Sequence, residues 1–382
     1  MLKQSDTMAG IYIHVPFCRK KCNYCDFYSV GEAKMDNHFT DFVLKELSLR
    51  NPLIADRIVK TIYFGGGTPS LLPTGNIKRI ISGLGDFFGV DPNAEITIEV
   101  NPDDVTLEVA EQYQAIGVNR VSIGIQSFNN DELIFLGRRH DVGKAVEAIR
   151  IFRKAGIANI SIDLIYGLPH STLKSWEHSL NVAFGLDIQH LSCYHLTYEE
   201  GTPLTRRVAK GTVMPLDEEM SKAQFDLLRE MSKNNGFIHY EISNLAKPGY
   251  ISKHNSGYWL GEEYLGLGPS AHSFNRSMRW WNPSSITGWE KEVDSASFPK
   301  NLEAIDEVTR FNELLITRLR TMWGVNLEEV ANGFSTEIYN HLRKKIIPFT
   351  GSGKMVMENN ILKIPPSHYF VSDSIVAELL MV

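Results

Sequence analysis

Short apolar runs alternate with amphipathic runs through the first half of the chain, and this alternation limits the possible folds more than any other feature. Apolar runs of strand length lie at 11–15, 59–64, 94–100, 120–125, 159–166 and 190–196, and runs with helical spacing lie at 34–49, 76–87, 107–114, 142–154 and 173–183. Strands that alternate with helices predict βα units and a parallel sheet. Six such units predict an α/β fold, a partial, open (β/α)6 barrel of the TIM type rather than the closed eight-unit form.

Polar or glycine-rich residues stand at the ends of these predicted strands. The second strand is followed by Gly65–Thr68, the third ends in Glu99, the fourth is followed by Gln126, the fifth contains Asp163, and the sixth ends near Tyr194-His195. The carboxyl ends of parallel barrel strands form one face, and that face carries the chemistry of such barrels. These residues are therefore expected to converge on one site, although the glycines alone also fit a tight turn.

The side chains at the strand ends suit a polar ligand. Glu99 and Asp163 lie in apolar strands, where a carboxylate is costly unless it is paired or ligated. Gln126 can donate and accept hydrogen bonds, which suits ribose hydroxyls or a carboxylate. Arg138, in the string LGRRH, either binds a ligand carboxylate through two hydrogen bonds or is a solvated surface arginine.

Three cysteines with the spacing C-x3-C-x2-C, Cys18, Cys22 and Cys25, follow the first strand. They can hold three corners of a [4Fe–4S] cube, which usually takes four cysteines, so that one iron is left open for an exchangeable ligand. A zinc site completed by His14 or Asp26 and a set of unrelated reduced cysteines are the alternatives. The only other cysteine is Cys193, and four cysteines in 382 residues do not predict a disulfide framework.

The composition is that of an ordinary globular protein, with 43% hydrophobic and 22% charged residues. A net charge of −6 gives no electrostatic case for nucleic acid as a partner. The N-terminus has no apolar signal core, and no apolar run is long enough to cross a bilayer. A cytoplasmic location is expected, and a reducing compartment also suits a thiolate-held iron cluster.

The cysteine loop after an N-terminal strand resembles the radical S-adenosylmethionine (SAM) superfamily, in which the open iron binds the amino and carboxylate groups of SAM. The strings IYIHVPFCRKKCNYCDFYS, IYFGGGTPSLL, ITIEVNPDDVT, RVSIGIQSFNNDELIFLGRRH and SIDLIYGLPHST resemble the oxygen-independent coproporphyrinogen III oxidase family over nearly the whole chain. The resemblance implies a [4Fe–4S] cluster on the three cysteines. It also implies a set of SAM contacts: Tyr12, Tyr24, Gly66, Gly67, Thr68, Glu99, Gln126, Arg138, Asp163 and Thr197.

Two departures point to a subgroup of that family. Its oxidases carry a fourth cysteine where this chain has Phe27, and they have a long extension before the first strand, where this chain has a short one. The shorter form is similar to the HemW-type haem chaperones, which carry the motif H-N-x-x-Y-W. It stands here as His254, Asn255, Tyr258 and Trp259, in an aromatic-rich segment from Gly249 to Pro283.

The resemblance implies that this motif binds haem. Histidine is a common axial ligand of haem iron, and Tyr258 and Trp259 can cover a porphyrin face or edge. A hydrogen-bonded structural role for His254 is the alternative.

Three domains are expected: the barrel at 1–236, a connecting aromatic-rich segment at 237–300, and a C-terminal domain at 301–382. Helical patterns near 305–321, 327–330 and 336–345, a hairpin over 355–364 and a last helix at 372–380 give the C-terminal domain a winged-helix-like order. Such an order can bind DNA, but the acidic charge and the absence of a basic stripe favour a small domain that caps the barrel mouth.

Two functions follow from the resemblance. The first is a radical-SAM-type haem chaperone that binds haem and transfers it to an acceptor protein, with a flavodoxin- or ferredoxin-type electron donor as a further partner. The alternative is an enzyme of porphyrin biosynthesis, which decarboxylates two propionates of coproporphyrinogen III oxidatively with a 5′-deoxyadenosyl radical. Phe27, the short N-terminus and the HNxxYW motif favour the chaperone.

Overall fold

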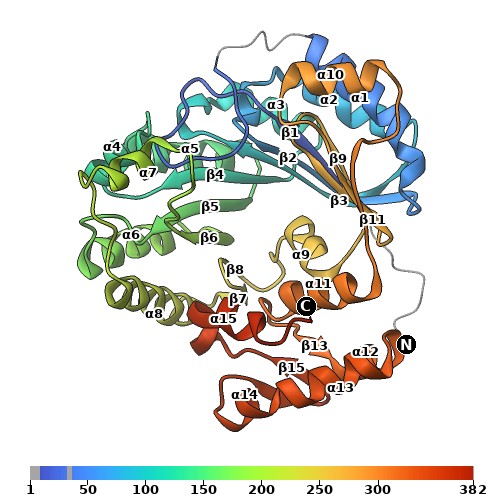
Figure 1. Ribbon diagram of the computed structural model, residues 1–382. Coiled ribbons are helices and arrows are strands. Elements are labelled where there is room, and N and C mark those ends of the chain that lie inside the picture. The colour runs from blue at the N-terminus through green and yellow to red at the C-terminus, as the bar shows by residue number, and fades with distance from the viewer. Residues whose placement is uncertain (1–8, 32–36, 382) are drawn as a thin grey trace.

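One sheet of twelve strands forms the frame of the protein in the computed structural model, which describes residues 9–31 and 37–381. Six neighbouring strands are parallel and follow one another in chain order: β1 (Ala9–Val15), β2 (Ile58–Gly66), β3 (Gly89–Val100), β4 (Arg120–Gln126), β5 (Asn159–Tyr166) and β6 (His190–His195). The sheet curves into an arch with one concave face (Figure 1). Because its two outermost strands, β12 and β7, do not pair with each other, the barrel is open, and the predicted fold class is confirmed.

Helices cover the convex face of the arch: α1 (Asn37–Arg50), α2 (Thr74–Leu84), α3 (Leu107–Ala115), α5 (Val142–Lys154) and α6 (Leu173–Gly185) (Figure 1). Several begin at the side-chain caps that the sequence provides. Thr106, Asp141 and Thr172 each accept a hydrogen bond from the backbone N–H three residues later. The first helix was predicted from Lys34, and residues 34–36 lie outside the described residues. Within the described part of the predicted barrel at 1–236, three helices were not predicted: α4 (Asn130–Leu136), α7 (Pro203–Ala209) and α8 (Glu218–Asn234).

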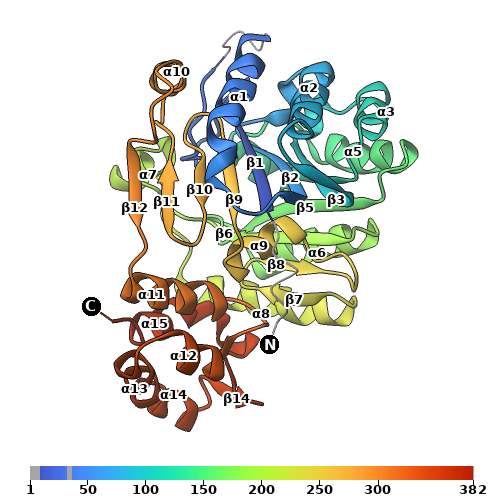
Figure 2. The same cartoon turned by 90° about the vertical axis from the view of Figure 1, so that its right-hand side faces the viewer.

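The segment that was expected to connect two domains adds strands to both edges of the sheet. On one side, β8 (Asn244–Ala246) pairs antiparallel with β6 and with β7 (Ile238–Glu241). On the other, β9 (Tyr264–Leu267) pairs parallel with β1, and β10 (His272–Phe274), β11 (Met278–Trp281) and β12 (Asn301–Ala304) follow (Figure 2). Between the two groups, α9 (Lys253–Leu260) lies on the concave side of the arch (Figure 1).

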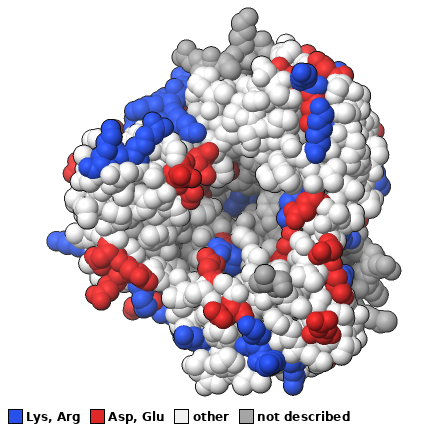
Figure 3. Space-filling model, viewed as in Figure 1, with Lys and Arg blue, Asp and Glu red and all other residues white. Residues whose placement is uncertain are grey.

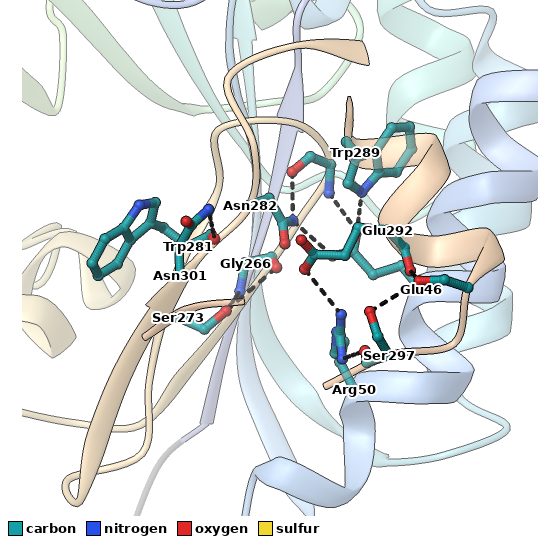
Figure 4. Close-up of polar contacts among 12 residues, drawn as sticks. Glu46, Arg50, Gly266, Ser273, Trp281, Asn282, Trp289, Glu292, Ser297 and Asn301 are labelled. Carbon is teal, nitrogen blue, oxygen red and sulfur yellow. Dashed lines mark hydrogen bonds and ion pairs between the residues drawn. The ribbon is translucent and has the colours of Figure 1, made fainter. Parts of the chain in front are cut away.

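A buried carboxylate ties this late segment to the first helix. Glu46 of α1 accepts hydrogen bonds from the backbone N–H of Gly268 at 2.8 Å, from the indole of Trp289 at 2.8 Å and from Asn282 at 2.6 Å (Figure 4). Trp289 belongs to α10 (Ile286–Asp294). Burial raises the pKa of Glu46 to about 7, although these donors lower it. The network therefore fixes β9, its following loop and α10 against α1, beside the strand that leads into the cysteine loop.

The C-terminal domain has the predicted winged-helix-like order. It contains α11 (Glu307–Arg318), β13 (Val325–Asn326), α12 (Leu327–Gly333), α13 (Thr336–Lys345), α14 (Ile347–Gly351), β14 (Val356–Glu358), β15 (Ile361–Lys363) and α15 (Ser372–Ala377). The hairpin turns at Asn359 and Asn360, whose φ values of 50° and 64° fit the type I′ turn that such hairpins favour. The domain lies below the arch and faces its concave side (Figure 1). Among the described residues, no helix is both long and apolar enough to cross a membrane.

Candidate SAM and iron–sulfur site

A cavity of about 730 Å³ opens at the carboxyl ends of β1 to β6. In the space-filling view from the same direction as Figure 1, the molecular surface is hollowed near the middle (Figure 3). The ends of β2 to β6 contribute to its wall, together with the cysteine loop that follows β1, and the 3-10 helix Pro366–Val371 and α15 line the far side. The expectation that the strand ends converge on one site is therefore met by the fold itself.

The three cysteines line this cavity and are each partly exposed. Cys18 Sγ lies 3.3 Å from Thr68 Oγ1, and Cys22 Sγ accepts a hydrogen bond from Arg138 at 3.4 Å. Burial raises the pKa of Cys25 to about 11, so its thiol stays protonated until a metal displaces the proton.

The surroundings of the cysteine loop bear on the zinc alternative. Within the described residues, no three His, Cys, Asp or Glu side chains are placed to hold one metal ion. His14, the alternative zinc ligand, is 4% exposed, and its two nitrogens contact Tyr12 OH at 3.1 Å and the carbonyl of Tyr28 at 3.0 Å. A zinc site completed by His14 is thus disfavoured.

Gly66 shows why the second strand ends in glycines. Its φ is +107°, and a Cβ there would lie 2.7 Å from the ring of His14. Any other residue would strain the backbone and push the ring away. The N–H of Gly66 donates to Glu99 Oε2 at 3.2 Å. The glycine turn therefore packs against β1 and also binds the carboxylate at the end of β3.

Glu99 is the carboxylate at the centre of the strand ends. It also accepts a hydrogen bond from Tyr63 OH at 2.8 Å. Burial raises the pKa of Glu99 to about 7, the nearby Asp163 raises it further, and the two donors lower it. Asp163 accepts a hydrogen bond from Ser122 at 3.2 Å, and burial raises its pKa too. A cationic ligand group in the cavity would meet two carboxylates, on both of which the charge of Arg120 also acts.

Gln126 and Arg138 approach the cavity from β4 and the loop after α4. Gln126 has a φ of 74°, an uncommon conformation for a residue other than glycine and one that clusters at functional sites. Arg138 donates to the carbonyl of Gly124 at 2.6 Å as well as to Cys22, and its Nε has no partner within the described residues. Burial would lower the pKa of Arg138, but Tyr24 and Cys22 beside it raise it. Arg138 is thus a fixed cation next to the cysteine loop.

The structure brings nearly all predicted SAM contacts to one cavity. Its wall includes Tyr24, Gly66, Gly67, Thr68, Glu99, Gln126, Arg138, Asp163 and Thr197. Tyr12 is not part of this wall; its ring lies in the barrel interior, 6.1 Å from that of Tyr63, and its hydroxyl contacts His14. That these residues bind SAM stays a prediction.

Comparisons with known proteins agree with this geometry. The model of the radical SAM superfamily matches residues 12–183. The haem chaperone HemW of Mycobacterium tuberculosis H37Rv is 33% identical over 323 residues, which cover 83% of each chain. HemW of Bacillus subtilis strain 168 is 31% identical over 335 residues, covering 87% of this chain and 88% of the relative. This chain belongs to the HemW family of radical SAM proteins.

A solved structure supports the fold of this HemW-family chain. Coproporphyrinogen III oxidase (HemN) from Escherichia coli, a radical SAM enzyme, superimposes with a TM-score of 0.84. The match covers 98% of this chain and 90% of the oxidase. At 21% sequence identity, the likeness bears on the fold alone.

The HNxxYW motif of this HemW-family chain lies on α9, inside the arch. His254 is 5% exposed; its Nδ1 lies 2.8 Å from Thr61 Oγ1 and its Nε2 lies 2.8 Å from Tyr258 OH. Burial lowers the pKa of His254 to about 3, so the ring is neutral. Asn255 donates to Tyr240 OH at 3.1 Å. None of the four motif residues belongs to the described wall of the cavity. Their contact with haem stays a prediction, while their hydrogen bonds are those of a structural motif.

Other wall residues were not assigned a role from the sequence: Asn101, Ser122, Gly124, Tyr166, His195, Arg320, Tyr369 and Phe370. His195 was expected at this face as the end of the sixth strand, and Ser122 stands on a predicted strand, so its position could have been inferred from the two-residue period of a strand. The last three come from the C-terminal domain. No local pattern indicates that they reach the cavity.

Proposed function

We propose that this chain is a haem chaperone: it binds haem and transfers it to an acceptor protein. The observation that carries the proposal is the similarity to HemW proteins over most of the chain, joined to a cavity that unites the three cysteines with nine predicted SAM contacts. Phe27, which stands where the related oxidases have a fourth cysteine, is 62% exposed and lines the same cavity. A cytoplasmic location and a flavodoxin- or ferredoxin-type electron donor belong to the proposal.

In this proposal, the thiolates of Cys18, Cys22 and Cys25 hold a [4Fe–4S] cluster, which supplies an open iron for SAM and an electron. Glu99 would accept hydrogen bonds from the amino group of SAM, and Arg138 would pair with its carboxylate, since both residues line the cavity. Gln126 and Asp163 suit the hydroxyls of the ribose, since both carry oxygen acceptors at the ends of neighbouring strands. Gly67 and Thr68 bring backbone close to the ligand next to Cys18.

The test uses full-length protein with an anaerobically reconstituted cluster. Haemin is titrated and followed by its Soret band, and the loaded protein is then mixed with apomyoglobin as a generic acceptor. We expect saturable binding, transfer to apomyoglobin, and no consumption of coproporphyrinogen III in the presence of SAM and a reductant. Turnover of coproporphyrinogen III together with an absence of saturable haemin binding would instead establish the oxidase.

A further inference from the structure

Lysines and arginines gather beside the cysteine loop, although the net charge of the chain is −6. This basic patch draws on the loop itself, the residue after Arg138, and α7 with the residue that follows it: Arg19, Lys20, Lys21, Arg139, Arg206, Arg207 and Lys210. Basic side chains cover the upper left of the molecule in Figure 3, beside the hollow and in the region where Figure 1 places α4 and α7. The proposed SAM contacts include none of these residues.

The fold holds the segments of the basic patch together. Asn23, in the middle of the cysteine loop, accepts a hydrogen bond through its carbonyl from the N–H of Leu204 in α7 at 2.9 Å. Its side chain donates to the carbonyl of Phe135 in α4 at 3.1 Å. The guanidinium of Arg207 lies 5.1 Å from the ring centroid of Phe135. The two unpredicted helices α4 and α7 therefore hold the cysteine loop and place the cations of α7 next to it.

Most charges of the basic patch are available to a partner. Five of its members form no ion pair with any described residue, and all but one of them are exposed: Lys20, Lys21, Arg206, Lys210 and the half-buried Arg207. Arg19 and Arg139 lie 3.6 Å and 3.8 Å from Asp104 and Asp103, but these two carboxylates are only 5% and 16% exposed. The patch thus presents positive charge to the solvent, which attracts an acidic partner.

The basic patch extends to one of the proposed cluster ligands. A small indentation beside the cavity is lined by Arg19, Lys20, Cys22 and Arg139, among others. Cys22 also lines the cavity itself, and its Sγ accepts the hydrogen bond from Arg138, the neighbour of Arg139. A protein seated on the patch would therefore lie against a cluster ligand and would leave the cavity free for SAM.

Two large apolar side chains are exposed close to these cations. Phe27 is 62% exposed, and its carbonyl accepts a hydrogen bond from Lys21 at 3.1 Å. Ile134 is 73% exposed and directly precedes Phe135, the ring that Arg207 contacts. Apolar groups among cations suit a partner with the complementary arrangement, an apolar redox ring with acids around it. A flavodoxin has this arrangement around the exposed edge of its flavin.

We propose that the basic patch is the docking surface for a flavodoxin that reduces the cluster. The inference rests on the cluster and the electron donor of the proposed function, and it assigns the surface that the donor uses. One electron passes from the anionic flavin hydroquinone, which becomes the neutral semiquinone, to the cluster, which goes from the 2+ to the 1+ state. No proton moves in this step.

The first experiment measures binding and needs no turnover. A purified bacterial flavodoxin in its oxidised state is titrated calorimetrically into the full-length protein at low and at high salt. The wild type is compared with Arg206→Glu/Lys210→Glu and with a matched control, Arg343→Glu/Lys344→Glu, on the exposed end of α13. Both double variants change the net charge equally. We expect the control to bind like the wild type, and the α7 variant to bind at least about tenfold more weakly with a smaller salt dependence.

A second experiment follows the reduction of the reconstituted cluster by its visible absorbance. The reductants are flavodoxin hydroquinone and photoreduced 5-deazariboflavin, which is small and uncharged. The α7 variant should slow the reduction by flavodoxin and leave the reduction by deazariboflavin unchanged. Arg206→Gln/Lys210→Gln, which removes the two charges without reversing them, should show the same effect to a smaller extent. It keeps the test decisive if the charge reversal impairs folding.

Haemin titration of the same proteins separates this inference from the proposed function. We expect the α7 variant to bind haemin like the wild type. A wild type that binds no haemin refutes the haem-chaperone function, whatever flavodoxin does. A wild type that binds haemin but shows no saturable binding of flavodoxin, or an equal loss of flavodoxin affinity in the α7 and control variants, refutes the docking surface and leaves the function in place. A plant-type ferredoxin that binds more tightly than flavodoxin, with the same loss in the α7 variant, would overturn the assignment to flavodoxin.

Discussion

Glu99→Gln tests the proposed SAM site through its pH dependence. Glu99 lies between the N–H of Gly66 and the hydroxyl of Tyr63, at the end of β3. Burial raises its pKa to about 7, so its charge changes within the range where binding can be measured. The charged carboxylate accepts hydrogen bonds from the amino group of SAM more strongly than the protonated form does. Binding should therefore be strongest above pH 7 and should weaken as the pH falls below it.

The magnitude follows from that pKa. At pH 8 about nine-tenths of Glu99 is charged, and at pH 5.5 only about 3% is. If the protonated form contributes no attraction, the affinity for SAM should fall about 30-fold between these two values, or roughly 2 kcal/mol. The amino group of SAM also titrates, near the top of this range, and it must lose its proton to bind the open iron, so SAM contributes a slope of its own. The part that belongs to Glu99 is the difference between the wild type and Glu99→Gln, whose side chain has no charge to lose and whose affinity should be lower and should depend less on pH.

Isothermal titration of SAM into the anaerobically reconstituted protein at several pH values measures this slope, with the visible spectrum confirming that the cluster persists. Tyr63→Phe provides a second arm. The hydrogen bond from Tyr63 lowers the pKa of Glu99, so its removal should move the midpoint of the profile above that of the wild type. A wild-type affinity that does not change with pH, or an equal slope in Glu99→Gln, would refute the assignment of Glu99 to the amino group of SAM.

The remaining predictions concern the cluster and the buried polar groups. Cys22→Ala should lose the broad visible absorbance of the reconstituted cluster, and retention of a full spectrum would contradict the ligand assignment. Glu46→Ala leaves three buried N–H donors, including that of Trp289, without an acceptor, so urea unfolding should show a loss of about 3 kcal/mol, and Glu46→Gln should lose less. His254→Ala removes two buried hydrogen bonds and should lower the free energy of unfolding by about 2–4 kcal/mol. Lys253→Ala, on the exposed side of the same helix, should change it little. Equal stability of the two variants would contradict the structural role of His254.

The parallel part of the fold could be predicted from the sequence because its signals are local. Each of β1 to β6 contains a short apolar run, and the side chains at its carboxyl end follow that run directly in the chain. Parallel pairing then brings those ends together without any further information. Because the strand ends meet, nine of the ten residues expected to contact SAM lie in one cavity. The hairpin at Asn359-Asn360 could also be predicted from the sequence, because asparagine is a residue type that adopts the positive φ of such a turn.

The rest depends on contacts between distant parts of the chain. The strands β7 to β12 are three or four residues long, too short for a periodic signal, and β9 pairs with β1 across more than half of the sequence. The HNxxYW motif could be recognised in the sequence. Whether its polar groups face a ligand or the barrel interior depends on where α9 packs. Arg320 and Phe370 line the cavity only because the C-terminal domain docks against the barrel. Tyr12 was placed at the ligand by resemblance; its ring stacks beside Tyr63, outside the described cavity wall, and its contact with SAM stays a prediction.

Tyr12 and His254 together show how the barrel interior supports the site from within. The hydroxyl of Tyr12 contacts His14, and His14 contacts the carbonyl of Tyr28, which follows the last cysteine by three residues. His254 stacks on Tyr63 at 5.0 Å, and Tyr63 donates to Glu99. One chain of contacts therefore leads from the interior to the cysteine loop and another leads to the carboxylate. Residues one contact away from the ligand site can thus support it. A buried carboxylate or a glycine-rich turn holds its position only when its own hydrogen-bond partners are fixed.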